Sequence, residues 1–281
     1  MGAEDPRLNA AGKQDFRLQR TWSCWKKADP APNRVKPIPM QVIRRIASMA
    51  ETCQIDTQFQ AASDMIIIAF FFLLRPGEYT DTPSESTPFR LVDVQIFVGD
   101  TRLDLAVSRP ERIHQATFVS LTFTDQKNGV RGEVIGLGRS GDPYLCPVKA
   151  VVRRVVYLRS KNAPPHTPLA RVMDGKRITP TLLTNILRNA VRVMTTDLGF
   201  LPDDVSARSL RAAGATALLL GNVDPDVIRL VGRWRSDEML RYLHTQAKPL
   251  MHDFAKRMLR SGHYTLIPNN LVGINQMVPQ R

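Results

Sequence analysis

Separate stretches of this chain carry cationic or aromatic side chains that suit chemistry on a phosphate group. Arg75 follows a strongly apolar run in LLRPGEY, and Lys127 stands just before an Asn-Gly turn in TDQKNGV. Arg208 and Arg211 are three residues apart, so we expect both to project from one face of the first turns of a helix. A helix N-terminus favours phosphate through its free N–H groups and its dipole, and two guanidinium groups would reinforce such a site.

The last of these stretches, GRWRSDEMLRYLH, places Trp234 before a predicted helix and Tyr242 within it. Taken one at a time, these residues also have ordinary structural interpretations. Arg75 could end a helix and pair with Glu78, and Lys127 could be a solvated turn residue. Trp234 could belong to the core, and Tyr242 could be a half-buried packing residue. The functional interpretation therefore depends on the order of the set along the chain.

The charge of the chain favours a polyanionic partner. Among its 281 residues, 39 Lys and Arg stand against 26 Asp and Glu, which gives a formal net charge of +13. Neutralising phosphates releases counterions and gives affinity that does not depend on base sequence, so a folded domain this basic favours nucleic acid. A ribosome-associated, RNA-binding or membrane-surface protein is the alternative on charge alone.

Hydrophobic periodicity and turn signals predict a mainly α fold with a small antiparallel β-sheet (α+β). Short runs of β-branched and apolar residues between about 90 and 137 predict strands, with turns at Gly99-Asp100 and Asn128-Gly129. The second turn would place Lys127 on a β-hairpin. Helices are expected at about 39–53, 58–74 and 148–158, from Thr179-Pro180 through DLG, from a Ser206 cap to Gly221, from Asp224-Pro225, and from a Ser236 cap through about 259.

Other features exclude several classes of protein. Cys24, Cys53 and Cys146 form no CxxC pair, so neither a disulfide framework nor a zinc site is indicated, and we expect no metal and no cofactor. The longest apolar run, 65–74, is too short to cross a bilayer, and the N-terminus lacks a signal peptide pattern. We expect an intracellular, DNA-associated protein that does not enter a membrane, located in the nucleus if the source is eukaryotic.

The ordered set of motifs resembles the tyrosine recombinase family, the phage-type integrases. The resemblance covers roughly 36–260 and is closest to recombinases of eukaryotic mobile elements. LRPGE matches the stretch of the first catalytic arginine, Arg75, and the hairpin Lys127 matches the catalytic lysine. ARSLR matches the His-x-x-Arg motif at Arg211. VGRW and Tyr242-Leu243-His244 match the third motif and the context of the nucleophilic tyrosine.

The resemblance implies a tyrosine recombinase catalytic-domain fold and metal-free DNA strand cleavage. Tyr242 would form a 3′-phosphotyrosyl bond, which conserves the energy of the broken phosphodiester for rejoining. Arg75 and Arg211 would clamp the charge that develops on the phosphate oxygens, and Lys127 would protonate the departing 5′-oxygen. Trp234 would pack at the site and donate its indole N–H to a phosphate oxygen.

The sequence departs from the family pattern at two positions of the predicted site. Arg208 stands where the family has histidine, and an arginine can hold a phosphate but cannot accept a proton. A catalytically impaired, recombinase-derived protein that binds duplex DNA is therefore the alternative function. The family spacing of nine positions before the tyrosine points to Arg233, whereas residue type points to Trp234.

The same resemblance sets the expected domains, partners and DNA contacts. Residues 1–35 would be a remnant of a helical DNA-binding domain with its linker, 36–260 the catalytic domain, and 261–281 a C-terminal tail. The stretch of about 80–116 is an insertion relative to the family. The partner would be double-stranded DNA, bound by a homo-oligomer in a tetrameric synapse. Additional DNA contacts are expected from Arg233, Arg235, Arg241 and His244.

Overall fold

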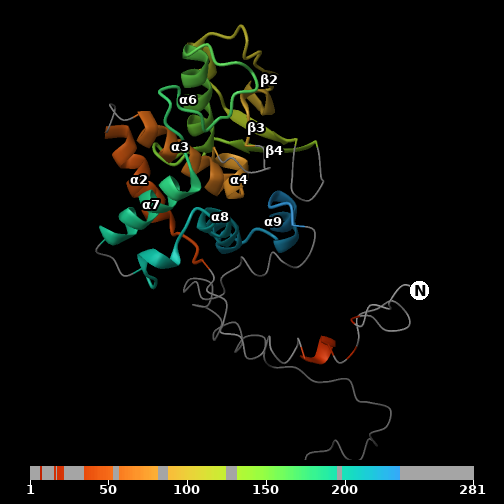
Figure 1. Cartoon of the computed structure of the whole chain (residues 1–281). Helices are drawn as coiled ribbons and strands as arrows, with labels where there is room; N and C mark the ends of the chain where they lie inside the picture. Colours follow the sequence, from red (N-terminus) through yellow and green to blue (C-terminus); the bar gives the residue numbers. More distant parts are fainter. Residues whose placement is uncertain are drawn as a thin grey trace, which may run out of the picture. The chain divides into compact units, whose positions relative to one another are not determined.

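The computed structural model describes residues 7, 16, 18–21, 35–52, 57–81, 88–124, 132–194 and 198–234. The chain divides into two compact units, Met1–Arg34 and Val35–Arg281. In the first unit, residues 16 and 18–21 are helical, within the segment for which the sequence predicts a helix. The elements described below belong to the second unit (Figure 1).

Helices make up about half of the described part of the second unit. The longer ones are α2 (Met40–Thr52), α3 (Thr57–Phe71), α6 (Pro147–Ser160), α7 (Pro180–Arg192), α8 (Ser209–Leu220) and α9 (Pro225–Val231). The shorter ones are α4 (Pro76–Tyr79) and α5 (Pro110–His114), with 3-10 turns η1 (Leu91–Asp93) and η2 (Pro202–Asp204). Four of the longer helices and both short ones begin at or next to a proline, which fits the first turn because it lacks an N–H that the helix leaves unpaired there.

The strands form one antiparallel sheet in the order β2-β1-β3-β4. They are β1 (Val94–Val98), β2 (Thr101–Arg102), β3 (Phe118–Phe123) and β4 (Glu133–Gly138). β1 and β2 join through Gly99-Asp100, where Gly99 has a φ of 58°, and this turn is the one that the sequence predicts. The mainly α fold with a small antiparallel sheet is thus confirmed.

Helix α3 is the centre of the core and positions the site. It packs against α2, α6 and α8, and α6 in turn packs against β3 and β4 (Figure 1). Ile66, Ile67 and Ile68 are consecutive and all fully buried, as expected of a helix that is apolar on every face. The C-terminal end of α3 also contacts α4, and the site begins there.

The packing of α8 against α3 depends on Gly214. A Cβ atom at this position would lie 2.3 Å from the Phe70 carbonyl oxygen and 2.4 Å from Leu73 Cδ2. On an exposed helix face Gly→Ala stabilises by about 1 kcal/mol, but here the new methyl group meets backbone. Gly214→Ala is therefore expected to destabilise the fold by roughly 2 kcal/mol or more, measured by denaturant unfolding. Ala217→Ser, on the exposed side of the same helix, is the control, and an unchanged Gly214→Ala midpoint would contradict the close contact.

Several predicted boundaries are wrong. The helix predicted for 58–74 ends at Phe71, because Leu73 adopts a left-handed conformation. The helix predicted from a Ser206 cap begins at Ser209 instead. The run RLDLAV contributes only its first residue to a strand, and α5 follows it unpredicted. The helix opened by Pro180 ends at Arg192, short of the predicted DLG.

Among the helices in the described residues, none combines the length and apolar character that a bilayer crossing requires. The predicted Ser236-capped helix and the tail beyond it lie outside the described residues, as does the Asn128-Gly129 turn.

Candidate active site

An unusual backbone turn after α3 forms the centre of the site. Leu73 is fully buried and has a φ of 52°, a conformation that costs a bulky residue about 1–3 kcal/mol. The turn leaves the Leu73 carbonyl available to two guanidinium groups from the C-terminal part of the chain. Arg211 Nη1 donates to it at 2.5 Å and Arg233 Nη2 at 3.1 Å. These two bonds account for the stability of the strained turn.

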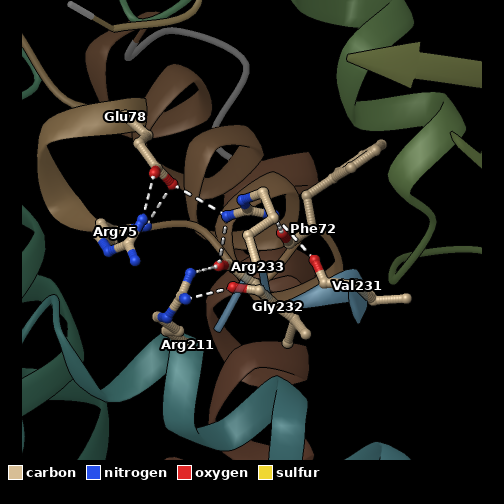
Figure 2. A network of polar contacts seen from close by, with 8 residues as sticks. Phe72, Arg75, Glu78, Arg211, Val231, Gly232 and Arg233 are labelled. Carbon is tan, nitrogen blue, oxygen red and sulfur yellow. Dashed lines mark hydrogen bonds and ion pairs between the residues drawn. The ribbon is translucent and has the colours of Figure 1, made fainter. Parts of the chain in front are cut away.

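Helix α4 begins directly after this turn and presents Arg75 and Glu78. The Arg75 backbone N–H donates to Glu78 Oε2 at 2.8 Å, and the Arg75 guanidinium donates to Glu78 Oε1 at 3.1 Å. Glu78 Oε2 also accepts from Arg233 Nη2 at 3.2 Å, so one carboxylate is shared by two arginines (Figure 2). The Arg75 side chain is 27% exposed, whereas that of Arg233 is 1% exposed. Of these two guanidinium groups, that of Arg75 is the one that solvent or a ligand can reach.

Arg211 projects from the first turn of α8 into the interior. Besides the bond to Leu73, its Nη2 donates to the Gly232 carbonyl (Figure 2). Its Cζ lies 4.2 Å from the centre of the Trp234 ring. A planar guanidinium can hold two carbonyls and stack on an aromatic ring at once, which an ammonium cannot do. Arg211 therefore ties the end of α3 to the segment that follows α9.

Arg208 lies in different surroundings. It is exposed and precedes the first residue of α8, whereas Arg211 is buried. The prediction that both arginines lie in the first turns of the helix is therefore wrong for Arg208, whereas the predicted phosphate contacts of the two residues stay a prediction. The difference arises because the helix begins at Ser209, so Arg208 stays outside it.

Arg233 is the most enclosed residue of the cluster. Its backbone has a φ of 57°, and its Nη1 donates to the carbonyls of Val231 at 2.9 Å and Phe72 at 3.3 Å. Its Cζ lies 3.8 Å from the centre of the Phe123 ring at the end of β3. Burial lowers the pKa of Arg233 to about 10, although the neighbouring carboxylate of Glu78 acts in the opposite direction. The Arg233 guanidinium is thus bound within the fold, and the DNA contact that the sequence predicts for this residue stays a prediction.

Trp234 completes the cluster on the side of α9. Its ring is buried with Leu73, Ala215 and Ile228. A Cβ atom on Gly232 would lie 1.6 Å from the Trp234 ring, so only glycine fits directly before the Arg233-Trp234 pair. Trp234 and Arg233, the two candidates for the third motif position, have different partners: Trp234 stacks on Arg211, whereas Arg233 pairs with Glu78.

The structure thus brings Arg75, Arg211, Arg233 and Trp234 together from three separated segments, and it leaves Arg208 exposed at the start of α8. The other predicted site residues lie outside the described residues: Lys127, Arg235, Arg241, Tyr242 and His244. The end of strand β3 lies against the cluster, because Phe123 contacts Arg233. Phe123 precedes Lys127 by four residues in the sequence.

Glu78 and Tyr79 help to form the site, but the sequence did not identify them as functional residues. The spacing of Arg75 and Glu78 suggests a pair, but it gives no sign that a distant arginine shares the carboxylate. The Tyr79 hydroxyl donates to the Ala207 carbonyl at 2.8 Å, and burial raises its pKa. Tyr79 therefore fixes α4 to the segment that leads into α8.

The cluster as a whole is suited to an anion. Arg75, Arg211 and Arg233 bring three guanidinium groups together, and the Glu78 carboxylate is shared by Arg75 and Arg233. Charge–charge interactions are stronger in a desolvated site than in water, and the partly exposed side chain of Arg75 is a part of the cluster that an anion can reach.

Comparisons with known proteins identify no close relative. No protein-family model and no curated protein matches the sequence. Among solved structures, the chain is similar to the Tn1549 transposon integrase in complex with transposon right-end DNA (15% identity, TM-score 0.45, covering 84% of this chain and 68% of that one). It is also similar to the XerH site-specific recombinase bound to palindromic difH substrate (11%, 0.48, 81% and 52%) and to the XerA recombinase (15%, 0.47, 82% and 65%). The chain therefore spans about half to two thirds of the length of these structures, and similarities this remote do not assign it to a family.

Proposed function

We propose that this chain is the catalytic domain of a tyrosine recombinase, which cleaves and rejoins duplex DNA through a 3′-phosphotyrosyl bond. The observation that carries the proposal is the meeting of Arg75, Arg211 and Trp234 around the strained Leu73 turn. These residues were selected from sequence motifs alone, and Leu73 and Arg211 lie 138 positions apart. The strong positive charge of the chain supports duplex DNA as the partner.

The proposed reaction follows from the chemistry of the residues. The Tyr242 oxygen attacks the scissile phosphorus, the phenolic proton passes to solvent, and the bond from phosphorus to the 5′-oxygen breaks. Lys127 gives a proton to the departing 5′-oxygen. Arg75 is placed to bind the phosphate directly, while Arg211 keeps Trp234 and the Leu73 turn in position. Attack by a 5′-hydroxyl on the phosphotyrosyl bond reverses these steps and rejoins the strand.

We also propose the domain bounds, the partner and the DNA contacts that the sequence predicts. Residues 36–260 would form the catalytic domain of a mobile-element recombinase that acts inside cells as a homo-oligomer on DNA. Arg235, Arg241 and His244 would add DNA contacts beyond the described residues.

The second candidate function is duplex-DNA binding without turnover. It is favoured by Arg208, which is exposed and replaces the histidine of the resembled family with a side chain that cannot accept a proton. Under this alternative the arginine cluster binds a phosphate but no strand is cut.

A covalent-capture experiment separates the two functions. The protein is incubated with nicked duplexes whose sequence around the nick is randomised, so that a cleaved fragment diffuses away and the adduct accumulates. Denaturing electrophoresis then detects a protein–DNA adduct, and sequencing of the captured DNA identifies the site. An adduct formed in the presence of a chelator supports the recombinase. Duplex binding without an adduct, with an adduct gained in Arg208→His, supports the impaired derivative, and absence of duplex binding overturns both.

A further inference from the structure

Glu133 lies beside the arginine cluster and has no part in the mechanism described above. It is the first residue of β4 and stands directly opposite Phe123 of β3 in the antiparallel register. Directly opposed residues of an antiparallel pair project to the same face of the sheet. Glu133 therefore shares a face with Phe123, whose ring lies 3.8 Å from Arg233 Cζ.

The polar atoms on this face are incompletely paired. Glu133 Oε2 and Arg233 Nε are both buried, and neither has a hydrogen-bond partner among the described residues. A buried carboxylate oxygen is costly unless a positive charge compensates it. Arg233 is a cation on this side of the sheet, held against the Phe123 ring.

Arg233 lies among charged groups of both signs, and Glu133 is one of them. Glu78 is shared by Arg75 and Arg233, and Arg211 binds the same Leu73 carbonyl as Arg233. Burial lowers the pKa of Arg233, Glu78 raises it, Arg75 lowers it, and Glu133 raises it. Glu133 is thus a second negative charge acting on Arg233, although it forms no direct ion pair with it among the described contacts.

We propose that Glu133 is a positioning residue: its carboxylate balances the buried guanidinium of Arg233, so that Glu78 remains shared with Arg75 and holds it ready for a phosphate. Without this charge, Arg233 would draw the Glu78 carboxylate away from Arg75. The effect on Arg233 follows from the fold alone, whereas the effect on strand cleavage rests on the proposed function.

A double-mutant cycle tests the coupling without any DNA. Glu133→Gln is expected to lower the thermal midpoint of unfolding by about 4 °C, as for a loss near 1 kcal/mol. In an Arg233→Gln background the same change should cause no further loss, because no charge remains to be balanced. Glu111→Gln, on the exposed face of α5, is the matched control and should leave the midpoint unchanged. Additive losses from Glu133→Gln and Arg233→Gln would overturn the coupling.

Strand cleavage on the captured DNA site tests the consequence for Arg75. Glu133→Gln should slow adduct formation at saturating DNA by about tenfold to a hundredfold with a much smaller change in DNA affinity, since a misplaced group costs rate in this range. Glu133→Asp should restore most of the rate, because it restores the charge. If the unaltered protein forms no adduct, the proposed function fails while the stability cycle still decides the role of Glu133. If it forms an adduct and Glu133→Gln is equally fast, the positioning role is refuted.

Discussion

Tyr242→Phe is expected to abolish the covalent protein–DNA adduct while duplex binding stays within about twofold of the unaltered protein. The substitution removes one oxygen atom, which is the proposed nucleophile, and keeps the aromatic ring. Loss of a catalytic nucleophile lowers turnover by roughly 10⁴-fold or more in enzymes that form covalent intermediates. Adduct formation on the captured site, followed by denaturing electrophoresis, measures the effect.

The matched control for this substitution is Tyr264→Phe. Tyr242 and Tyr264 are the two tyrosines in the stretch 235–281, and both lie outside the described residues. Only Tyr242 follows closely after Arg233 and Trp234 in the sequence. If the adduct survives Tyr242→Phe but disappears in Tyr264→Phe, the nucleophile is Tyr264. If the adduct survives both substitutions, neither tyrosine of this segment is the nucleophile.

Arg211→Lys is expected to lower both stability and strand cleavage, because Arg211 binds two carbonyls and stacks on Trp234. A lysine keeps the charge but cannot reach the Leu73 and Gly232 carbonyls in the same planar arrangement. Leaving a buried carbonyl without its donor costs about 1–3 kcal/mol, so we expect a loss near the upper part of that range. Cleavage should fall by about 10²-fold, as when a group at the site is misplaced.

Two measurements separate these effects. Denaturant unfolding gives the free energy of unfolding, and adduct formation well below the unfolding transition gives the cleavage rate of the folded protein. Arg192→Lys, on an exposed position of α7, is the charge-matched control and should change stability by no more than about 0.5 kcal/mol. An Arg211→Lys variant as stable and as active as the control would contradict the central position of Arg211.

Glycine and proline patterns placed much of the fold correctly. The Gly99-Asp100 turn, the Pro180 and Pro225 helix starts and the buried Ile66–Ile68 run follow from local rules of backbone conformation and periodicity. The end of α3 could not be predicted in this way. Its early stop at Phe71 depends on the left-handed Leu73, which is held by Arg211 and Arg233 from the far end of the chain.

The sequence by itself determined which residue types could act on a phosphate, since Arg75, Arg211 and Trp234 were selected from their motifs and do meet in the structure. Only the tertiary structure decided how each is used. It separated exposed Arg208 from buried Arg211, gave Arg233 and Trp234 different partners, and added Glu78 and Glu133 as counter-charges. The physical reason is that the charge state and the hydrogen-bond partners of a buried guanidinium depend on groups that burial brings near it. Those groups lie up to 161 positions away in this chain, beyond the reach of any local pattern.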